Sequence, residues 1–213
     1  MKILVFLGSV RDSTPPRPAR LGQRVARAVA GQLTAAGHEA ELIDPLEIAL
    51  DRPFKPQFAF AAGRAPEALD TLAVKIGAAH GYVMVSPEYN HTMSPALGDL
   101  LNHFGSALFS YKPSVIATYS AGQWGGARAA VSMRTFLGEL GCLPVSAMIH
   151  VPKAHEVLDA DGALLPGISE DWHGYFGRAF DQMIWWASAA REQRLVSDPP
   201  GAFSRDPSQR NAP

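Results

Sequence analysis

Cysteine is almost missing from this chain of 213 residues, which contains only Cys142. A single cysteine excludes an internal disulfide bond and any cysteine-rich metal site. The seven histidines are scattered and show no H-x-x-x-H spacing, so we expect no metal site. The chemistry of the chain must therefore come from other residue types.

An excess of charge of one sign is missing as well. The 19 basic and 20 acidic residues give a formal net charge of -1. This balance gives no general reason to expect nucleic acid or an anionic membrane surface as a partner. It leaves small molecules and other proteins as the partners to consider.

Long apolar runs are the third absence. None approaches the roughly 20 residues that a membrane-spanning helix needs. The apolar run at residues 1–7 is short and continues into Gly8-Ser9 and a charged segment, which is typical of a strand and not of a signal peptide. We therefore expect a cytoplasmic protein with no membrane partner. Its 47% hydrophobic and 18% charged residues are those of a globular chain.

The glycine fingerprints of two common nucleotide-binding folds are missing too. After the first predicted strand, Gly8 is the only glycine before Gly22, so there is no G-x-G-x-x-G motif. The pattern G-x-x-x-x-G-K-[ST] is also absent. The sequence therefore carries neither the dinucleotide-binding fingerprint nor a P-loop.

Strand and helix patterns alternate along most of the chain. Apolar runs predict strands at residues 3–7, 39–44, 81–86, 113–120 and 144–151. Apolar residues at helical spacing predict helices at 20–36, 65–79, 95–108, 126–140 and 169–193. Five such pairs predict an α/β fold with a doubly wound parallel sheet and helices on both faces. We expect a single domain over residues 1–193 and a disordered tail at 194–213, which is rich in proline, serine and charge.

Three loops follow the first, third and fourth predicted strands. The first begins with Gly8-Ser9-Val10-Arg11 and contains further hydroxyl groups at Ser13 and Thr14 and cations at Arg17 and Arg20. Hydroxyls, guanidinium groups and the amides of a helix start are suited to a phosphate dianion. The alternative is a solvated surface loop.

The second and third loops suit a flat ligand. In Pro87-Glu88-Tyr89-Asn90-His91, the tyrosine could stack on a ring and the asparagine could form hydrogen bonds. In the segment 120–126, Ser-Ala-Gly-Gln-Trp-Gly-Gly, the glycines would allow backbone amides to approach a ring closely. A capped turn and a plain strand-to-helix turn are the alternatives. Ligands of open α/β sheets bind at the carboxyl ends of the strands, where these loops lie.

The three motifs together resemble those of the flavodoxin-like NADPH-dependent FMN reductase family. That family includes NAD(P)H:quinone, azo-dye and chromate reductases, and the resemblance extends over residues 1–155. It implies a flavodoxin-like five-stranded sheet of order 2-1-3-4-5 and a non-covalently bound FMN. It further implies NADPH, or NADH, as reductant, a small-molecule electron acceptor (flavin, quinone, azo compound or metal oxyanion) and a homodimer or homotetramer.

The resemblance also implies roles for particular residues. Ser9 and Arg11 would hold the phosphate group, completed by Arg20, Leu21 and Gly22, which we favour over Ser13 or Arg17 because they open the helix. The other residues would lie along the isoalloxazine and ribityl parts of FMN: Pro87, Glu88, Tyr89, Asn90, Ser120, Gly122, Gln123, Gly125 and Gly126. No catalytic residue is expected, because the cofactor itself carries the reactivity.

Two other functions remain open. A flavodoxin-like electron carrier would share the fold, although such carriers are usually strongly acidic and this chain is nearly neutral. A flavin-binding protein that senses redox state through a partner is the second alternative. Trp185 lies off the predicted buried stripe of the last helix and indicates a subunit contact.

Overall fold

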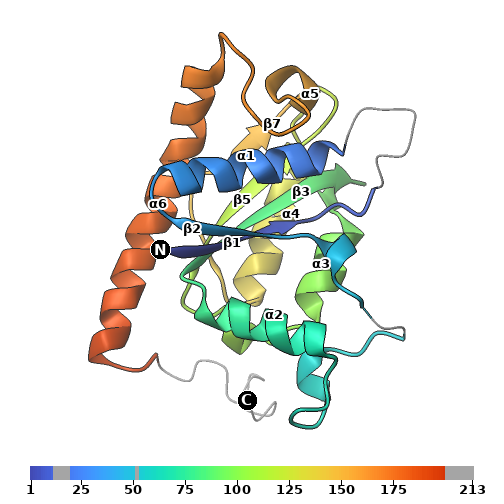
Figure 1. The fold of residues 1–213 in the computed structure, drawn as a ribbon, viewed down its shortest axis with the longest axis vertical. Coiled ribbons are helices and arrows are strands. Elements are labelled where there is room, and N and C mark those ends of the chain that lie inside the picture. Colours follow the sequence, from blue (N-terminus) through green and yellow to red (C-terminus); the bar gives the residue numbers. More distant parts are fainter. Residues whose placement is uncertain (12–19, 51–52, 200–213) are drawn as a thin grey trace.

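The computed structural model describes residues 1–11, 20–50 and 53–199, which form a sheet of seven strands with helices on both faces (Figure 1). The strands are β1 (Lys2–Leu7), β2 (Glu39–Ile43), β3 (Gly81–Tyr89), β4 (Thr92–Met93), β5 (Pro113–Tyr119), β6 (Leu143–Pro144) and β7 (Ile149–Val151). The α-helices are α1 (Leu21–Ala35), α2 (Glu67–Ala78), α3 (Pro95–Asn102), α4 (Ala127–Glu139), α5 (Ala154–Val157) and α6 (Ser169–Val196). Short 3-10 helices cover Pro45–Glu47, Gln57–Ala59 and Ser106–Leu108.

The sheet has the predicted flavodoxin-like topology. Its strand order is β2-β1-β3-β5-β6, with β7 also paired to β5 and all of these pairs parallel. The extra strand β4 pairs only with the end of β3, as an antiparallel hairpin. The order predicted for five strands is therefore confirmed once β4 is set aside. From β1 the chain adds β2 on one side and then β3 on the other, so the order of strands reverses between β1 and β3. Sheets of this kind bind ligands at that point.

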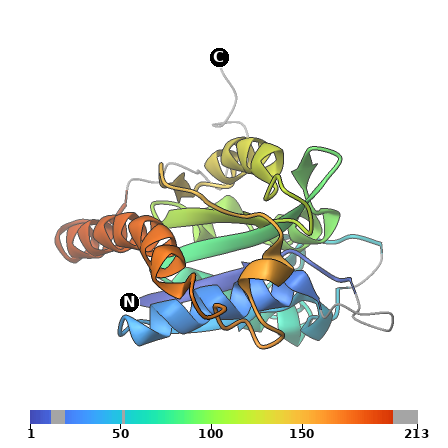
Figure 2. The ribbon, with the colours of Figure 1, turned by 90° about the horizontal axis from the view of Figure 1, so that it is seen from above.

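Two apolar cores lie on the two faces of the sheet. One packs β-strand side chains against α1 and α6, with Val25, Val29 and Phe176 among its members. The other packs the opposite side chains against α2, α3 and α4. Seen from above, α1 and α4 lie on opposite sides of the strands (Figure 2). The predicted inward faces of the helices are confirmed by this packing.

The predicted fifth strand is wrong in one respect, because it is interrupted. Residues 145–148 separate β6 from β7; the Val145 amide still donates to the Ser114 carbonyl oxygen of β5 at 2.9 Å, and side chains of two helices bond to the rest of this stretch. The Gln182 side-chain oxygen on α6 accepts hydrogen bonds from the Ser146 hydroxyl (2.9 Å) and the Ala147 amide (3.0 Å). The Arg134 guanidinium donates to the carbonyl oxygens of Pro144 and Val145 at 3.2 and 3.0 Å. These side chains replace the missing strand pairing.

Several predicted boundaries also shift. The third helix ends at Asn102 and not at residue 108, and the His103 carbonyl accepts a hydrogen bond from the Gln57 amide at 2.8 Å instead of continuing the helix. Pro66 is the N-cap of α2 and not its first residue. The last helix continues to Val196, three residues past its predicted end at 193. The predicted tail beyond residue 199 lies outside the described residues. Within the described chain, no helix is both long and apolar enough to cross a membrane.

The one cysteine is expected to be chemically inert. Cys142 is 4% exposed, and burial raises the pKa of its thiol to about 12. Because the thiolate is the nucleophile, we expect iodoacetamide at pH 8 to modify the folded protein at less than about a hundredth of the rate seen in urea. Mass spectrometry of timed samples measures both rates. Equal rates would show that the thiol is accessible.

Candidate functional site

Three strand ends meet at one edge of the sheet. Leu7 at the end of β1 pairs with Val85 of β3, and Pro87 of β3 pairs with Tyr119 at the end of β5. The loops that follow these strands therefore start side by side. This is the arrangement predicted from the sequence.

Ser94 fastens the first loop to the second. Its hydroxyl donates to the Gly8 carbonyl oxygen and accepts from the Leu97 amide at 3.1 Å, and its own amide donates to the Ser86 hydroxyl at 2.9 Å. Gly8 fits here because it has no side chain. A Cβ atom at Gly8 would lie 2.7 Å from the Val85 carbonyl oxygen. The sequence predicts Ser94 as the N-cap of a helix, which is confirmed, but not its bond to Gly8.

Ser9 and the start of α1 form the phosphate-like end of the site. Ser9 is 5% exposed, and its hydroxyl accepts a hydrogen bond from the Arg11 amide at 3.4 Å. By helix geometry the amides of Leu21 and Gly22 have no acceptor inside the helix, and the first amide with one is that of Gln23, which donates to the Arg20 carbonyl oxygen at 3.0 Å. Within the described residues, the first turn of α1 has no acidic side chain. An anion would therefore meet hydroxyl and amide donors at a positive helix end.

Arg20 points to a carboxylate of the protein. Its two terminal nitrogens donate to the two carboxylate oxygens of Asp44 at 2.5 and 2.9 Å, and both residues are buried. Asp44 also accepts from the Leu46 amide at 3.0 Å. The pair joins the end of β2 to the start of α1. Of the other residues considered for a phosphate site, Ser13, Thr14 and Arg17 lie outside the described residues.

The second loop is a hairpin, and the third strand continues past its predicted end at residue 86. Strand β3 continues through Tyr89, which pairs with Thr92 of β4. Asn90 and His91 between them have positive φ values of 50° and 61°. Two consecutive residues of this kind form the type I′ turn that suits the twist of a two-residue hairpin. The exposed tip, with Tyr89 40% exposed, therefore extends past the edge of the sheet.

Glu88 joins this hairpin to the third loop. One of its carboxylate oxygens accepts from the amides of Arg128 (3.1 Å) and Ala129 (3.3 Å), and the other accepts from the Arg128 side chain at 2.7 Å. The two amides belong to the first turn of α4, whose N-cap, Gly126, has no side chain. Glu88 thus acts as the helix cap from another strand, and its charge opposes the positive end of α4. Sequence reasoning does not find this contact, because the partners are 40 and 41 residues apart.

Replacing Glu88 by alanine is expected to lower the free energy of unfolding by about 0.5–2 kcal/mol, as for loss of a helix cap. The matched control is Arg128→Ala, which removes the ion pair of a half-exposed guanidinium and its contact with the Trp124 ring (6.0 Å) but leaves both backbone amides in place. It should cost less than about 1 kcal/mol. Urea unfolding measures both. If Arg128→Ala lowers the free energy of unfolding as much as Glu88→Ala does, the stabilisation comes from the ion pair and not from the helix cap.

The third loop is shaped by Ser120 and two glycines. The Ser120 hydroxyl donates to the Gly122 carbonyl oxygen (2.7 Å) and accepts from the Gly125 amide (2.9 Å). Gly125 and Gly126 have φ values of 58° and 75°, which disfavour any other residue. Gln123 and its neighbour Trp124 are exposed. The loop therefore presents backbone at the edge of the sheet, as the sequence predicts.

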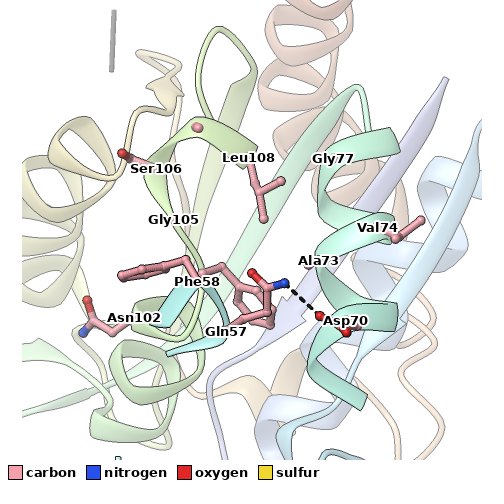
Figure 3. A pocket seen from close by; sticks show the side chains of 12 residues that line it. Gln57, Phe58, Asp70, Ala73, Val74, Gly77, Asn102, Gly105, Ser106 and Leu108 are labelled. Atoms are coloured by element: carbon pink, nitrogen blue, oxygen red, sulfur yellow. Dashed lines mark hydrogen bonds between the residues drawn. The ribbon is translucent and has the colours of Figure 1, made fainter. Parts of the chain in front are cut away.

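A well-formed cavity among the described residues lies elsewhere. It has a volume of about 1040 Å³ and lies between α2, the 3-10 helix at Gln57–Ala59 and residues 102–108 (Figure 3). Its one acidic side chain, Asp70, accepts a hydrogen bond from Gln57 at 2.8 Å. No lining residue comes from the three loops. We place the candidate site at the loops and not at this cavity, because the loops follow the carboxyl ends of neighbouring parallel strands, where such sheets bind ligands. Among residues 1–11, 20–50 and 53–199, no cluster of His, Cys, Asp and Glu could hold a metal ion.

Comparisons with known proteins identify relatives of this chain. Residues 1–156 match the model of the protein family described as NADPH-dependent FMN reductase. An NAD(P)H-dependent FMN reductase of Pseudomonas aeruginosa is 29% identical over 169 residues, covering 78% of this chain and 85% of its own. An NADPH azoreductase of a Bacillus species is 37% identical over 71 residues, 33% of this chain and 40% of its own. The solved structure of FerB, a flavoenzyme NAD(P)H:(acceptor) oxidoreductase from Paracoccus denitrificans, shares the fold with a TM-score of 0.67 at 16% identity, covering 86% of this chain and 97% of FerB.

Proposed function

Because this chain belongs to the NADPH-dependent FMN reductase family, we propose that it binds FMN at the three loops and transfers hydride from NADPH or NADH to a small acceptor. The observation that supports this site most is the convergence of the three loops at the point where strand order reverses. The family match ends at residue 156 and so includes all three loops.

The donors at this edge fit the parts of FMN. The Ser9 hydroxyl, the Arg11 guanidinium and the first amides of α1, from Leu21 and Gly22, would hold the phosphate. The hairpin of Pro87, Glu88, Tyr89 and Asn90 would flank the ring system. The loop formed by Ser120, Gly122, Gln123, Gly125 and Gly126 would face its pyrimidine edge. Arg20 would act by positioning α1 through its pair with Asp44.

Bound FMN supplies the acceptance and release of hydride, so the protein needs no acid or base of its own. The residues of the site bind the phosphate, orient the ring and leave one side of it open to the nicotinamide and the acceptor. Backbone amides of the loop 122–125 would stabilise negative charge at the pyrimidine edge in the reduced state. Glu88 holds this loop through α4 and takes no part in proton transfer.

The acceptor is proposed to be a flavin, quinone, azo compound or metal oxyanion, since an open flavin edge suits each of these. We also propose a homodimer or homotetramer. On α6, Trp185 is 64% and Trp186 49% exposed, and large exposed aromatic side chains are typical of subunit contacts. A cytoplasmic location is proposed because the reductant, NAD(P)H, is found there.

An absorption spectrum of the purified protein, before and after anaerobic addition of NADPH, tests this function. We expect a two-band flavin spectrum that bleaches on mixing. A colourless protein that takes up no added FMN would overturn the proposal. Steady oxidation of NADPH in air separates a reductase from a flavodoxin-like carrier, which would show none. Slow turnover, with a protein partner that binds only one redox state, would support the sensing alternative.

A further inference from the structure

We infer that Tyr119 is a positioning residue of the phosphate site, acting through Ser9 and the first turn of α1. This inference rests on the proposed function. Tyr119 is the last residue of β5 and precedes the third loop, but its side chain lies under the first loop. Through Tyr119, the geometry of the phosphate site would depend on β5, the strand that also leads into the third loop.

The first contact is with Ser9. The Tyr119 hydroxyl lies close enough to the Ser9 side chain for the two hydroxyl groups to interact, and both residues are 5% exposed. A buried hydroxyl bonded to another hydroxyl fixes the direction of its hydrogen and lone pairs. Ser9 is therefore held in one orientation before a ligand arrives. Such preorganisation lowers the entropic cost of binding.

The second contact is with Gly22 in the first turn of α1. A Cβ atom at Gly22 would lie 2.3 Å from the Tyr119 hydroxyl oxygen and 2.9 Å from the ring carbon that carries it. The helix start therefore rests directly on the tyrosine, and only glycine allows this approach. Tyr119 thus touches both elements that would donate to the phosphate.

The electrostatic surroundings agree with this role. Burial, the largest influence, raises the pKa of Tyr119 above its ordinary value, while the hydrogen bond with Ser9 and the nearby Arg20 and Arg11 act in the opposite direction. The Tyr119 hydroxyl is therefore protonated at neutral pH. Arg11 on the first loop and Arg20 at the start of α1 are thus both close enough to Tyr119 to influence its pKa, as expected where the first loop, α1 and β5 meet.

Dissociation constants for FMN and for riboflavin, which lacks the phosphate, test the inference. We expect Tyr119→Phe to weaken FMN binding about 3- to 10-fold, as for loss of one hydrogen bond, and to leave riboflavin binding unchanged. Adding Tyr119→Phe to Ser9→Ala should weaken FMN binding no further, because the tyrosine acts through the serine. Quenching of flavin fluorescence gives the dissociation constants of the wild type, the two single variants and the double variant.

Two matched controls separate positioning from general damage. Tyr82→Phe removes a buried hydroxyl that donates to the carbonyl oxygens of Ile76 (2.9 Å) and Leu108 (3.1 Å), outside the three loops. It should leave the affinity for FMN unchanged. Gly22→Ala should weaken FMN binding by at least about 10-fold, whereas Gly31→Ala, in open space on the same helix, should not. Tyr119→Phe should partly rescue Gly22→Ala by removing the nearest atom.

The outcomes distinguish the inference from the proposed function. A wild-type protein that binds no FMN overturns both. If the wild type binds FMN and Tyr119→Phe binds it equally well, only the inference fails. Equal loss of affinity for FMN and riboflavin also overturns it, since the tyrosine would then support the whole site. If Tyr119→Phe does not fold, the FMN affinities of Gly22→Ala and Gly31→Ala are compared instead. Equal affinities of these two variants would overturn the inference.

Discussion

Replacing Asp44 by alanine is expected to lower the free energy of unfolding by about 3–5 kcal/mol, because it leaves a buried charge without its partner. Arg20 and Asp44 are only 8% and 6% exposed. Both terminal nitrogens of the arginine donate to the carboxylate, at 2.5 and 2.9 Å. The Leu46 amide loses its acceptor in the same variant. Since Arg20 is the N-cap of α1, the affinity for FMN should fall as well.

The ion pair Lys153–Glu156 provides the matched control. Its side chains are 53% and 56% exposed, so Glu156→Ala should cost less than about 1 kcal/mol. The double variant Arg20→Met with Asp44→Leu should lose less stability than Asp44→Ala, because no buried charge remains unpaired. Urea unfolding curves give the three values. If Asp44→Ala unfolds within 1 kcal/mol of the wild type, the pair does not hold α1 to β2.

The same pair shows what the sequence could and could not predict. The strands and helices follow from apolar periodicity, which is local, so the sequence predicts where they lie but misplaces some ends, most clearly that of the third helix, and misses the interruption of the fifth strand. Arg20 was predicted to contact a phosphate because it opens a helix after a loop rich in donors. Its partner Asp44 lies 24 residues away, directly after β2, and no local pattern pairs the two. The position of Asp44 at the end of a predicted strand was the only available signal.

The candidate site divides in the same way. The motif residues were predicted because each loop has a recognisable composition. The residues that hold the loops together lie outside the motifs or act at long range: Ser94 on Gly8, Tyr119 on Ser9 and Glu88 on α4. The hairpin was missed because Asn90-His91 lacks the glycine that usually marks a type I′ turn. The interrupted fifth strand was missed because Gln182 and Arg134, which replace its pairing, come from two helices.

The glycine at the start of α4 is expected to be the most sensitive position of the third loop. Gly126 has a φ of 75°, and a Cβ atom there would lie 2.9 Å from the Cβ of Thr118. The left-handed conformation costs roughly 1–2 kcal/mol for a residue with a side chain. Crowding in a packed site adds roughly 1–3 kcal/mol. We therefore expect Gly126→Ala to lower the free energy of unfolding by about 2–5 kcal/mol.

Gly138 in the same helix provides a control of opposite sign. It is exposed, and a Cβ atom there would meet nothing within 4 Å. Alanine is favoured over glycine within a helix, and since Gly138 lies in the last turn of α4, Gly138→Ala should raise the free energy of unfolding by at most roughly 0.5–1 kcal/mol. Only Gly126→Ala should also weaken FMN binding, since it moves the amides that Glu88 and Ser120 hold in place. Urea unfolding and FMN titration of Gly126→Ala test these expectations. A free energy of unfolding equal to that of the wild type would show that the start of α4 tolerates a side chain. A destabilised variant that binds FMN as tightly as the wild type would show that the third loop does not contact the flavin.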